Sequence, residues 1–198
     1  MTNATTTHPI TQFQTWLDEA KKDARMEMPN AMCLATATSD GIPSSRMVLL
    51  KDADERGLVF YTNFGSKKAQ DLTQNPRASA CFYWDTLGKQ VRVNGTIERV
   101  SDEEADAYFA SRARRSRIGA WASKQSQPLT SMKHLYGRVA KTTARYPVGD
   151  IPRPDFWGGY RIVPLTFEFW QLGDFRIHER QKFYLQECGT WTSELLYP

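Results

Sequence analysis

Residues 44–72 read SSRMVLLKDADERGLVFYTNFGSKKAQDL and contain two strand-forming runs followed by the start of a helix. Arg46–Lys51 and Leu58–Thr62 are rich in aliphatic, β-branched and aromatic residues, and the polar stretch 52–57 between them is typical of a turn. Asn63-Phe64-Gly65 interrupts the second run, and Ser66 is a favourable N-cap for a helix that begins at the next residue. The segment therefore predicts two antiparallel strands that lead directly into a helix N-terminus.

Two lysines, Lys67 and Lys68, occupy the first turn of this predicted helix. A helix N-terminus offers unpaired backbone N–H groups and a partial positive charge, so cations are unfavourable there unless an anion is bound. Phosphate groups commonly bind at such a site. The alternative is that both lysines are ordinary solvated surface residues, and this stretch alone leaves the two interpretations about equal.

The flanking segments continue the pattern of short strands joined by turns. An apolar face over 11–25 predicts a first helix, and Ser39-Asp40-Gly41 is a hairpin signal between strands at 32–38 and 44–51. Further helices are expected from about 102 and over about 131–146, and further strands at 78–84, 90–100, 160–164, 166–171, 175–180, 183–186 and 191–195. This order predicts a mainly β, α+β protein, an antiparallel barrel with peripheral helices.

The composition is that of a folded protein of one domain. The chain has 198 residues, of which 40% are hydrophobic and 12% aromatic, enough for a packed core. We expect a single domain over 10–198, preceded by a polar, Thr-rich tail over 1–9 that is disordered.

The net charge and the cysteine content indicate which class of ligand and which cellular compartment to expect. The net charge of +4 and a pI near 9.0 suit an anionic ligand but are weak evidence for nucleic acid. Cys33, Cys81 and Cys188 are far apart, with no metal-ligand spacing, so we expect neither a disulfide framework nor a metal site. Without a secretory signal or a membrane-length apolar run, the default expectation is a cytoplasmic protein.

A second candidate anion site follows the capping box at Ser101. Tyr108 and Arg112 are four residues apart, and Ser116 follows at the same interval if one helix persists, so the three share a helical face. A phenol, a guanidinium and a hydroxyl make a hydrogen-bonding set suited to a phosphate. The competing interpretations are a solvated basic helix and a nucleic-acid patch, because three more arginines interleave with the set.

The third candidate lies near the C-terminus. On a strand, Arg176, His178 and Arg180 would point to one face, where three potential cations repel one another unless an anion or a partner lies among them. A lone histidine is usually structural, but one flanked by two arginines on the same face favours a site.

Seven segments resemble the pyridoxine/pyridoxamine 5′-phosphate oxidase family. They are RMVLLK (46–51), VFYTN with GSKKA (59–69), YFASR with Ser116 (108–116), IGAWASKQS (118–126), FWGGY (156–160), EFWQ (168–171) and RIHER (176–180). Seven linked motifs in the family's order, from about Ile10 to the C-terminus, are far more specific than any one of them. The resemblance implies a split-barrel FMN-binding fold and a homodimer with FMN at the subunit interface.

The resemblance also implies roles for individual residues. It assigns the substrate phosphate to Lys51, Tyr108, Arg112 and Ser116, and it places Arg176 and His178 over the substrate's pyridine ring as the catalytic pair. It assigns FMN contacts to Arg46, Met47, Val48, Leu49, Leu50, Tyr61, Thr62, Lys67, Lys68, Gln90, Gln125, Ser126, Trp170 and Arg180. Strict strand alternation puts Arg46 and Lys51 on opposite faces, so they should serve different phosphates unless a bulge intervenes.

The implied reaction is oxidation of pyridoxamine or pyridoxine 5′-phosphate to pyridoxal 5′-phosphate. A hydride equivalent passes from the substrate's C4′ to the flavin, and dioxygen then reoxidises the flavin and yields hydrogen peroxide. The main alternative is a related split-barrel oxidase of the phenazine-biosynthesis type, which acts on another aromatic substrate. A basic nucleic-acid-binding module built on residues 112–117 is a weaker alternative, because no recognised nucleic-acid motif is present.

The chain departs from the family pattern in three places. The N-terminal arm is short, Lys67 stands where arginine is frequent, and Leu195 replaces an arginine near the C-terminus. The first and third departures put lid closure and any secondary ligand site in doubt. The preference between the two phosphorylated substrates, the rate and any regulation by product do not follow from the sequence.

Overall fold

The computed structural model describes residues 3–5, as backbone only, and residues 8–198. The helices are α1 Pro9–Lys22, α2 Lys67–Gln74, α3 Asp102–Ser111, α4 Arg114–Ala122 and α5 Met132–Arg145, with short 3₁₀ turns η1 Asp85–Leu87 and η2 Asp174–Arg176. The strands are β1 Asn3–Thr5, β2 Ala31–Ala37, β3 Pro43–Leu49, β4 Asp52–Asp54, β5 Gly57–Asn63, β6 Arg77–Trp84, β7 Lys89–Arg99, β8 Trp157–Gln171, β9 Glu179–Leu185 and β10 Trp191–Leu195.

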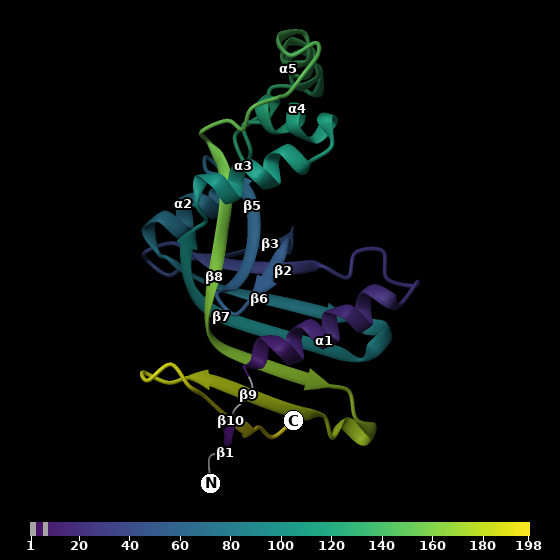
Figure 1. The fold of residues 1–198 in the computed structure, drawn as a ribbon, viewed down its shortest axis with the longest axis vertical. Coiled ribbons are helices and arrows are strands. Elements are labelled where there is room, and N and C mark those ends of the chain that lie inside the picture. Colours follow the sequence, from purple (N-terminus) through teal and green to yellow (C-terminus); the bar gives the residue numbers. More distant parts are fainter. Residues whose placement is uncertain (1–2, 6–7) are drawn as a thin grey trace.

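All strands of the described chain pair antiparallel in one curled sheet, which confirms the expected fold class (Figure 1). The strand order is β1-β10-β9-β8-β7-β6-β2-β3, and β5 pairs with β8 and β4 away from this path. Along one edge of β8, residues 157–162 pair with β5 and residues 166–171 pair with β9. The sheet therefore divides at β8, which is the split of the barrel.

Strand β8 corrects the expectation of two strands at 160–164 and 166–171. It runs without interruption along β7, and the register shifts opposite Asn94 and Gly95, so that Leu165 is the extra residue. Pro164, which lacks an N–H donor, lies at this irregularity, where a proline is tolerated within a sheet. A proline that suggested a strand end in the sequence therefore marks a bulge.

The segment 44–72 folds into its predicted elements but with different partners. β3 pairs with β2 as the hairpin signal predicted, and the helix α2 begins at Lys67. The predicted turn at 52–57 contains the short strand β4, which pairs with the start of β5. β5 then pairs with β8 in place of β3, so the expectation that the two strands of this segment pair with each other is wrong.

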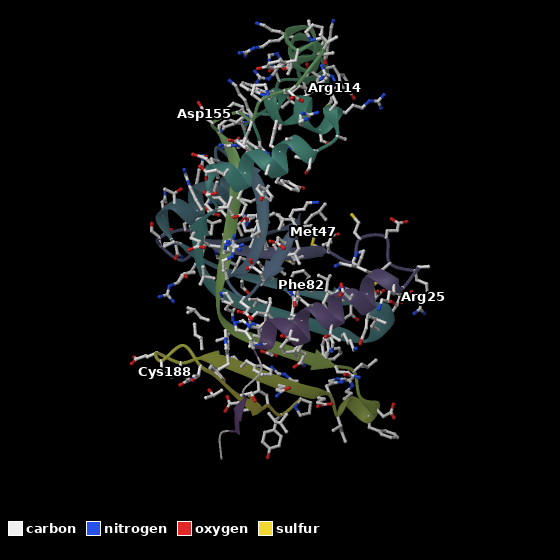
Figure 2. All side chains as sticks on the ribbon, in the orientation of Figure 1. Arg25, Met47, Phe82, Arg114, Asp155 and Cys188 are labelled. Atoms are coloured by element: carbon white, nitrogen blue, oxygen red, sulfur yellow. The ribbon has the colours of Figure 1, made fainter. Side chains whose placement is uncertain are left out.

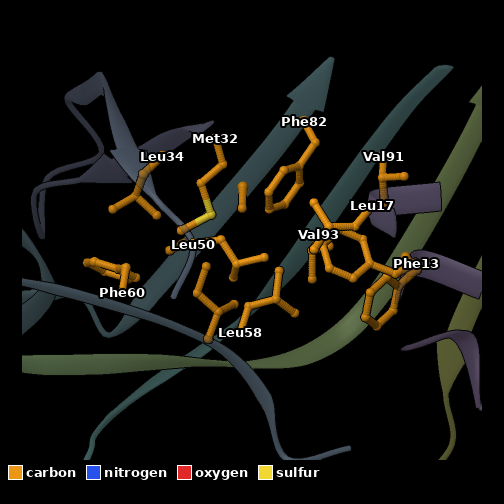
Figure 3. Close-up of a cluster of buried hydrophobic side chains, with 14 of the residues drawn as sticks. Phe13, Leu17, Met32, Leu34, Leu50, Leu58, Phe60, Phe82, Val91 and Val93 are labelled. Carbon is orange, nitrogen blue, oxygen red and sulfur yellow. The ribbon is translucent and has the colours of Figure 1, made fainter. Parts of the chain in front are cut away.

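The main core lies between the curled sheet and α1. Alternate residues of β2, β6 and β7 are buried, as the side-chain period of a strand requires. From α1, the fully buried Phe13 packs edge-on against Phe82 at a ring distance of 4.9 Å (Figure 3). A separate small cluster of Phe109, Ile118, Ile151 and Trp157 joins α3 and α4 to the start of β8.

The predicted tail over 1–9 is described only in part. Asn3–Thr5 pairs with β10, and Pro9 is the first residue of α1, while residues 1–2 and 6–7 lie outside the described part. The helix ends at Lys22, not near Arg25, and Ala24 is exposed beyond its end. Among the described helices, none combines the length and the apolar character needed to cross a bilayer.

Candidate active site

A cavity of about 700 Å³ lies between the end of β3, the strand β5 and the helices α3 and α4. All four residues assigned to the substrate phosphate line it: Lys51, Tyr108, Arg112 and Ser116. Of the residues assigned to FMN, it is lined by Met47, Val48, Leu49, Tyr61, Thr62, Lys68 and Gln125. Figure 2 shows Met47 on its strand below these helices. Residues from β3, α3 and the 118–126 segment, distant in sequence, thus meet in one space.

Three parallel aromatic rings form one wall of the cavity. Tyr61 stacks on Tyr108 with ring centroids 4.0 Å apart, and the ring of Trp157 lies parallel to both, 5.4 Å from Tyr61 and 6.2 Å from Tyr108. Burial, followed by the nearby charge of Glu104, raises the pKa of Tyr61 to about 12. Tyr61 therefore stays neutral at physiological pH and keeps its hydroxyl proton for donation. A flat apolar wall of this kind suits an aromatic ligand.

Arg112 brings a cation to this wall without a carboxylate partner. Its guanidinium carbon lies 4.6 Å from the centroid of Trp157, and its buried Nη1 has no hydrogen-bond partner within the described chain. Burial lowers the pKa of Arg112 from its usual value, although an arginine stays protonated. A buried N–H without an acceptor is costly, so this geometry favours an anionic ligand that accepts from it.

The helical stripe predicted through Tyr108, Arg112 and Ser116 is wrong in detail. α3 ends at Ser111, Arg112 is extended (φ −73°, ψ 146°), and α4 begins at Arg114. Ser111 Oγ donates to the carbonyl of Tyr108 at 2.8 Å, the kind of local hydrogen bond that competes with helix continuation. The break nevertheless leaves all three predicted residues on the same cavity.

Lys68 is a second cation on the cavity lining. It is only 7% exposed, and its Nζ donates to Thr62 Oγ1 at 3.1 Å and to Gln125 Oε1 at 3.3 Å. Burial, with a further contribution from the charge of Arg46, lowers the pKa of Lys68 to about 8. An ammonium group held by neutral acceptors is a good partner for a phosphate.

Lys67 and Arg46 are not on the cavity lining, so the two predicted lysines are not equivalent. Both instead contact the buried carboxylate of Asp71, Lys67 by a close ion pair and Arg46 at 3.9 Å. Ser66 is the N-cap of α2 as expected, although its side chain makes no capping hydrogen bond. Met47, Leu49 and Lys51 line the cavity while Arg46 does not, which agrees with strand alternation, but Val48 lines it too although it shares a strand face with Arg46.

A second group of predicted residues lies on the sheet formed by β7, β8 and β9. Gln90, Trp170 and Arg180 are direct cross-strand neighbours, and the His178 ring lies 4.8 Å from that of Trp170. Arg180 donates to Glu168 Oε1 at 2.7 Å. None of these residues lines the cavity near α3 and α4. Figure 1 shows β9 and η2 at the opposite end of the molecule from α4, as the labels Arg114 and Cys188 also indicate in Figure 2.

The strand predicted over 175–180 is wrong at its start. Phe175 and Arg176 have positive φ (52° and 65°) within the turn η2, and β9 begins only at Glu179. His178 Nδ1 accepts from the backbone N–H of Gly173 at 3.3 Å, which closes this turn. Arg176 is exposed and does not share a strand face with His178 and Arg180.

Two other predicted residues lie outside the cavity, and several contributors to the site were not predicted. Leu50 is buried in the core, and Ser126 is exposed with φ 67°. Asn63, Ser123 and Trp157 line the cavity as well, and Asp71 pairs with Lys67 beside it. The spacing of four residues between Lys67 and Asp71 on a helix was the available signal for the last of these.

Comparison with known families and proteins agrees with this geometry. Residues 18–145 match the family model described as pyridoxamine 5′-phosphate oxidase, and residues 157–198 match that of the pyridoxine 5′-phosphate oxidase C-terminal dimerisation region. A pyridoxine/pyridoxamine 5′-phosphate oxidase of Brucella anthropi is 52% identical over 204 residues, which cover 100% of both chains.

Two solved structures share the fold. PhzG from Burkholderia lata, solved with tetrahydrophenazine-1-carboxylic acid, superposes with a TM-score of 0.90 at 34% identity, covering 96% of this chain and 93% of that one. A pyridoxamine 5′-phosphate oxidase-related, FMN-binding protein of Nostoc punctiforme gives a TM-score of 0.79 at 18% identity, covering 98% and 99%. The second likeness concerns the fold alone.

Proposed function

Because this chain belongs to the pyridoxamine 5′-phosphate oxidase family, an oxidoreductase family, we propose that it oxidises pyridoxamine and pyridoxine 5′-phosphates to pyridoxal 5′-phosphate. FMN is the cofactor, dioxygen the electron acceptor and hydrogen peroxide the second product. The observation that carries the proposal is one cavity with two separate cationic positions, at Arg112 and at Lys68. Two phosphate-bearing molecules, a cofactor and a substrate, are what such a cavity is suited to bind.

The residues present fit FMN. Lys68, Thr62 and Gln125 would hold its phosphate, and the exposed edge of β3 at Met47–Leu49 would lie along the rest of the molecule. Lys68 has no carboxylate partner, so a phosphate completes its hydrogen bonds without displacing an ion pair. When bound, FMN supplies a hydride acceptor that dioxygen can reoxidise.

The remaining polar residues of the cavity would bind and orient the substrate. Arg112 Nη1, Lys51 and the hydroxyls of Tyr108 and Ser116 would hold the substrate phosphate, and the parallel rings of Tyr61 and Tyr108 would restrict where its pyridine ring can lie. Such positioning lowers the barrier by fixing the reacting carbon against the acceptor before the reaction.

The distribution of the assigned residues supports a homodimer. Gln90, Trp170, Arg176, His178 and Arg180 lie away from the cavity of their own chain, so a second copy would have to bring them to it. The cross-strand register places Met47, Cys33, Cys81 and Arg92 on one face of the sheet, with Glu168 beyond them. This outer face includes the exposed side chains of Met47 (64%) and Tyr83 (63%). The match of residues 157–198 to a dimerisation region supports the same assembly.

One experiment tests the function and its main alternative. The purified protein should be yellow and should consume dioxygen with pyridoxine and pyridoxamine 5′-phosphates, releasing hydrogen peroxide. Unphosphorylated pyridoxine should be a poor substrate, because the cationic set around Arg112 then has no phosphate to bind. Oxidation of a reduced phenazine carboxylic acid with no activity on either phosphate would favour the alternative that the likeness to PhzG raises. A colourless protein without flavin would contradict both.

A further inference from the structure

Asp71 is a fully buried carboxylate beside the proposed cofactor site, and no role has been assigned to it so far. It is 1% exposed and lies on α2, one helical turn after Lys67. Its Oδ2 accepts from Thr36 Oγ1 at 2.8 Å, and its Oδ1 forms the close ion pair with Lys67. Burial would raise the pKa of Asp71, but hydrogen bonds from Lys67 and Thr36 and the charges of Lys67 and Arg46 outweigh it and lower the pKa.

Asp71 and Thr36 together fix the guanidinium of Arg46. Arg46 Nη1 donates to Thr36 Oγ1 at 2.7 Å, and Nη2 lies 3.9 Å from Asp71 Oδ2 and 2.7 Å from Ser44 Oγ. Thr36 thus accepts from the arginine and donates to the carboxylate. Since the group is held on several sides, Arg46 has little freedom to reorient.

The cations around Asp71 form one electrostatic group with Lys68. The charge of Arg46 lowers the pKa of Lys68, which shows that the two cations act on each other. Arg46 and Lys67 contact the one carboxylate of Asp71, whereas Lys68 donates to neutral acceptors. The three cations therefore carry two more positive charges than Asp71 can balance. A phosphate monoester carries about −1.5 to −2 charge at neutral pH, so it matches that excess.

We propose that Asp71 is a positioning residue for the cofactor phosphate, which it does not touch. It holds Lys67 and, with Thr36, Arg46 in place behind Lys68, the cation on the cavity lining, so that the positive group is ordered before the phosphate arrives. The proposal rests on the FMN function proposed above. The role predicts the opposite of what the net charge alone predicts. Removing the negative charge of Asp71 should by itself strengthen the binding of an anion, whereas loss of preorganised cations should weaken FMN binding.

The test is the affinity of the full-length, flavin-stripped protein for FMN and riboflavin, measured by flavin fluorescence. Asp71→Asn should bind FMN about tenfold more weakly, the size expected for disordered charge-assisted hydrogen bonds, and riboflavin as well as wild type does. Thr36→Val keeps the carboxylate but removes the hydroxyl that joins it to Arg46, so it should lose FMN affinity in the same direction. It also keeps the test decisive if Asp71→Asn does not fold. Asp54→Asn, which removes a carboxylate paired with Arg161 outside the cavity, is the matched control.

Each result either supports or overturns the proposed role of Asp71. FMN affinity that is unchanged or tighter in both Asp71→Asn and Thr36→Val overturns the inference and leaves the proposed function standing. An equal loss of FMN and riboflavin affinity indicates a purely structural role and also overturns it. A wild-type protein that binds no FMN overturns the proposed function and this inference together. Selective loss of FMN affinity, absent in Asp54→Asn, supports it.

Discussion

The ring of Tyr61 lies parallel to that of Tyr108, at a centroid distance of 4.0 Å and an interplanar angle of 15°. Tyr61 comes from β5 and is assigned to the cofactor, whereas Tyr108 comes from α3 and is assigned to the substrate. The two proposed binding sets are therefore in direct contact. Tests of either set need separate readouts for bound flavin and for turnover.

Arg112→Ala should mainly raise KM for pyridoxine 5′-phosphate. The contact with a phosphate exists equally in the ground and transition states, so the loss should be roughly 1–3 kcal/mol in binding with kcat less affected. Bound-flavin absorbance should stay at the wild-type level, since Arg112 is assigned to the substrate. Arg115→Ala, an exposed arginine on α4, is the control and should change neither value. An unchanged KM in Arg112→Ala, or loss of flavin, would contradict the assignment.

The affinity for FMN should fall as pH rises above about 8. Burial, then the charge of Arg46, lowers the pKa of Lys68 to about 8 in the free protein, and a bound phosphate favours the protonated amine. Binding is therefore strongest below this pKa and weakens as the amine loses its proton. Lys68 affects folding stability with the opposite pH dependence. Its pKa in the folded protein lies below its unfolded value of 10.5, so the unfolded state binds the proton more tightly. The free energy of unfolding should therefore increase with pH between about 8 and 10.5.

The measurement is a fluorescence titration of FMN between pH 7 and 10, with Lys68→Ala as the reference. This variant should bind more weakly throughout and should lose most of the pH dependence in this range. If wild type and Lys68→Ala showed parallel pH profiles, another group would be responsible.

Mixed dimers should reveal that each site uses residues of both chains. Arg176→Ala should lower kcat, because a misoriented substrate has a higher activation barrier for the reaction. The protein should stay yellow, since Arg176 is not assigned to FMN. An Arg176→Ala chain paired with an Arg112→Ala chain, isolated through two different tags, would contain one doubly altered and one intact site. It should regain about half of the wild-type activity. If both residues served the same chain's site, each site would carry one defect and activity would stay low.

The outer face of the sheet should be the dimer interface. Tyr83→Glu places a charge on an exposed side chain of β6, next to Gln90 of β7, and should shift the protein toward monomer. Flavin content should fall with it, since the site is then incomplete. Tyr136→Glu on α5, with a similarly exposed tyrosine at 65%, is the control for the charge itself. Analytical ultracentrifugation at several protein concentrations, together with flavin absorbance, distinguishes the outcomes; a Tyr83→Glu dimer with full flavin would exclude this face.

The features best predicted from the sequence are those that depend on neighbouring residues alone. The alternation that buries Met32 and Leu34 in β2, and the capping serines Ser66 and Ser101 before α2 and α3, are local features, and these elements appear where the sequence predicts them. The partner of β5 was not predictable in this way, because Leu58 pairs with Ile162 about a hundred residues later. The end of α3 at Ser111 and the left-handed pair Phe175 and Arg176 accompany local hydrogen bonds whose strength relative to the regular structure the sequence pattern does not indicate.

The candidate site, too, was predicted only in part from the sequence. The resemblance grouped Lys51, Tyr108, Arg112 and Ser116, and the fold brings them to one cavity. Asp71 was missed because its hydrogen-bond partner Thr36 lies on a strand distant in sequence and not on its own helix. The roles assigned to Arg176 and His178 stay predictions, since these residues would act across two chains.

Strand β8 also sets the order in which the polypeptide can fold as it leaves the ribosome. β5 and β7 both complete their pairing on β8, and residues 157–171 are synthesised long after either strand. Until then the nascent chain exposes two unpaired apolar strand edges, which are prone to association with other chains. We expect folding to be largely post-translational and slow, as sheets with distant pairings are. Premature termination before β8 should therefore yield insoluble fragments rather than smaller folded domains.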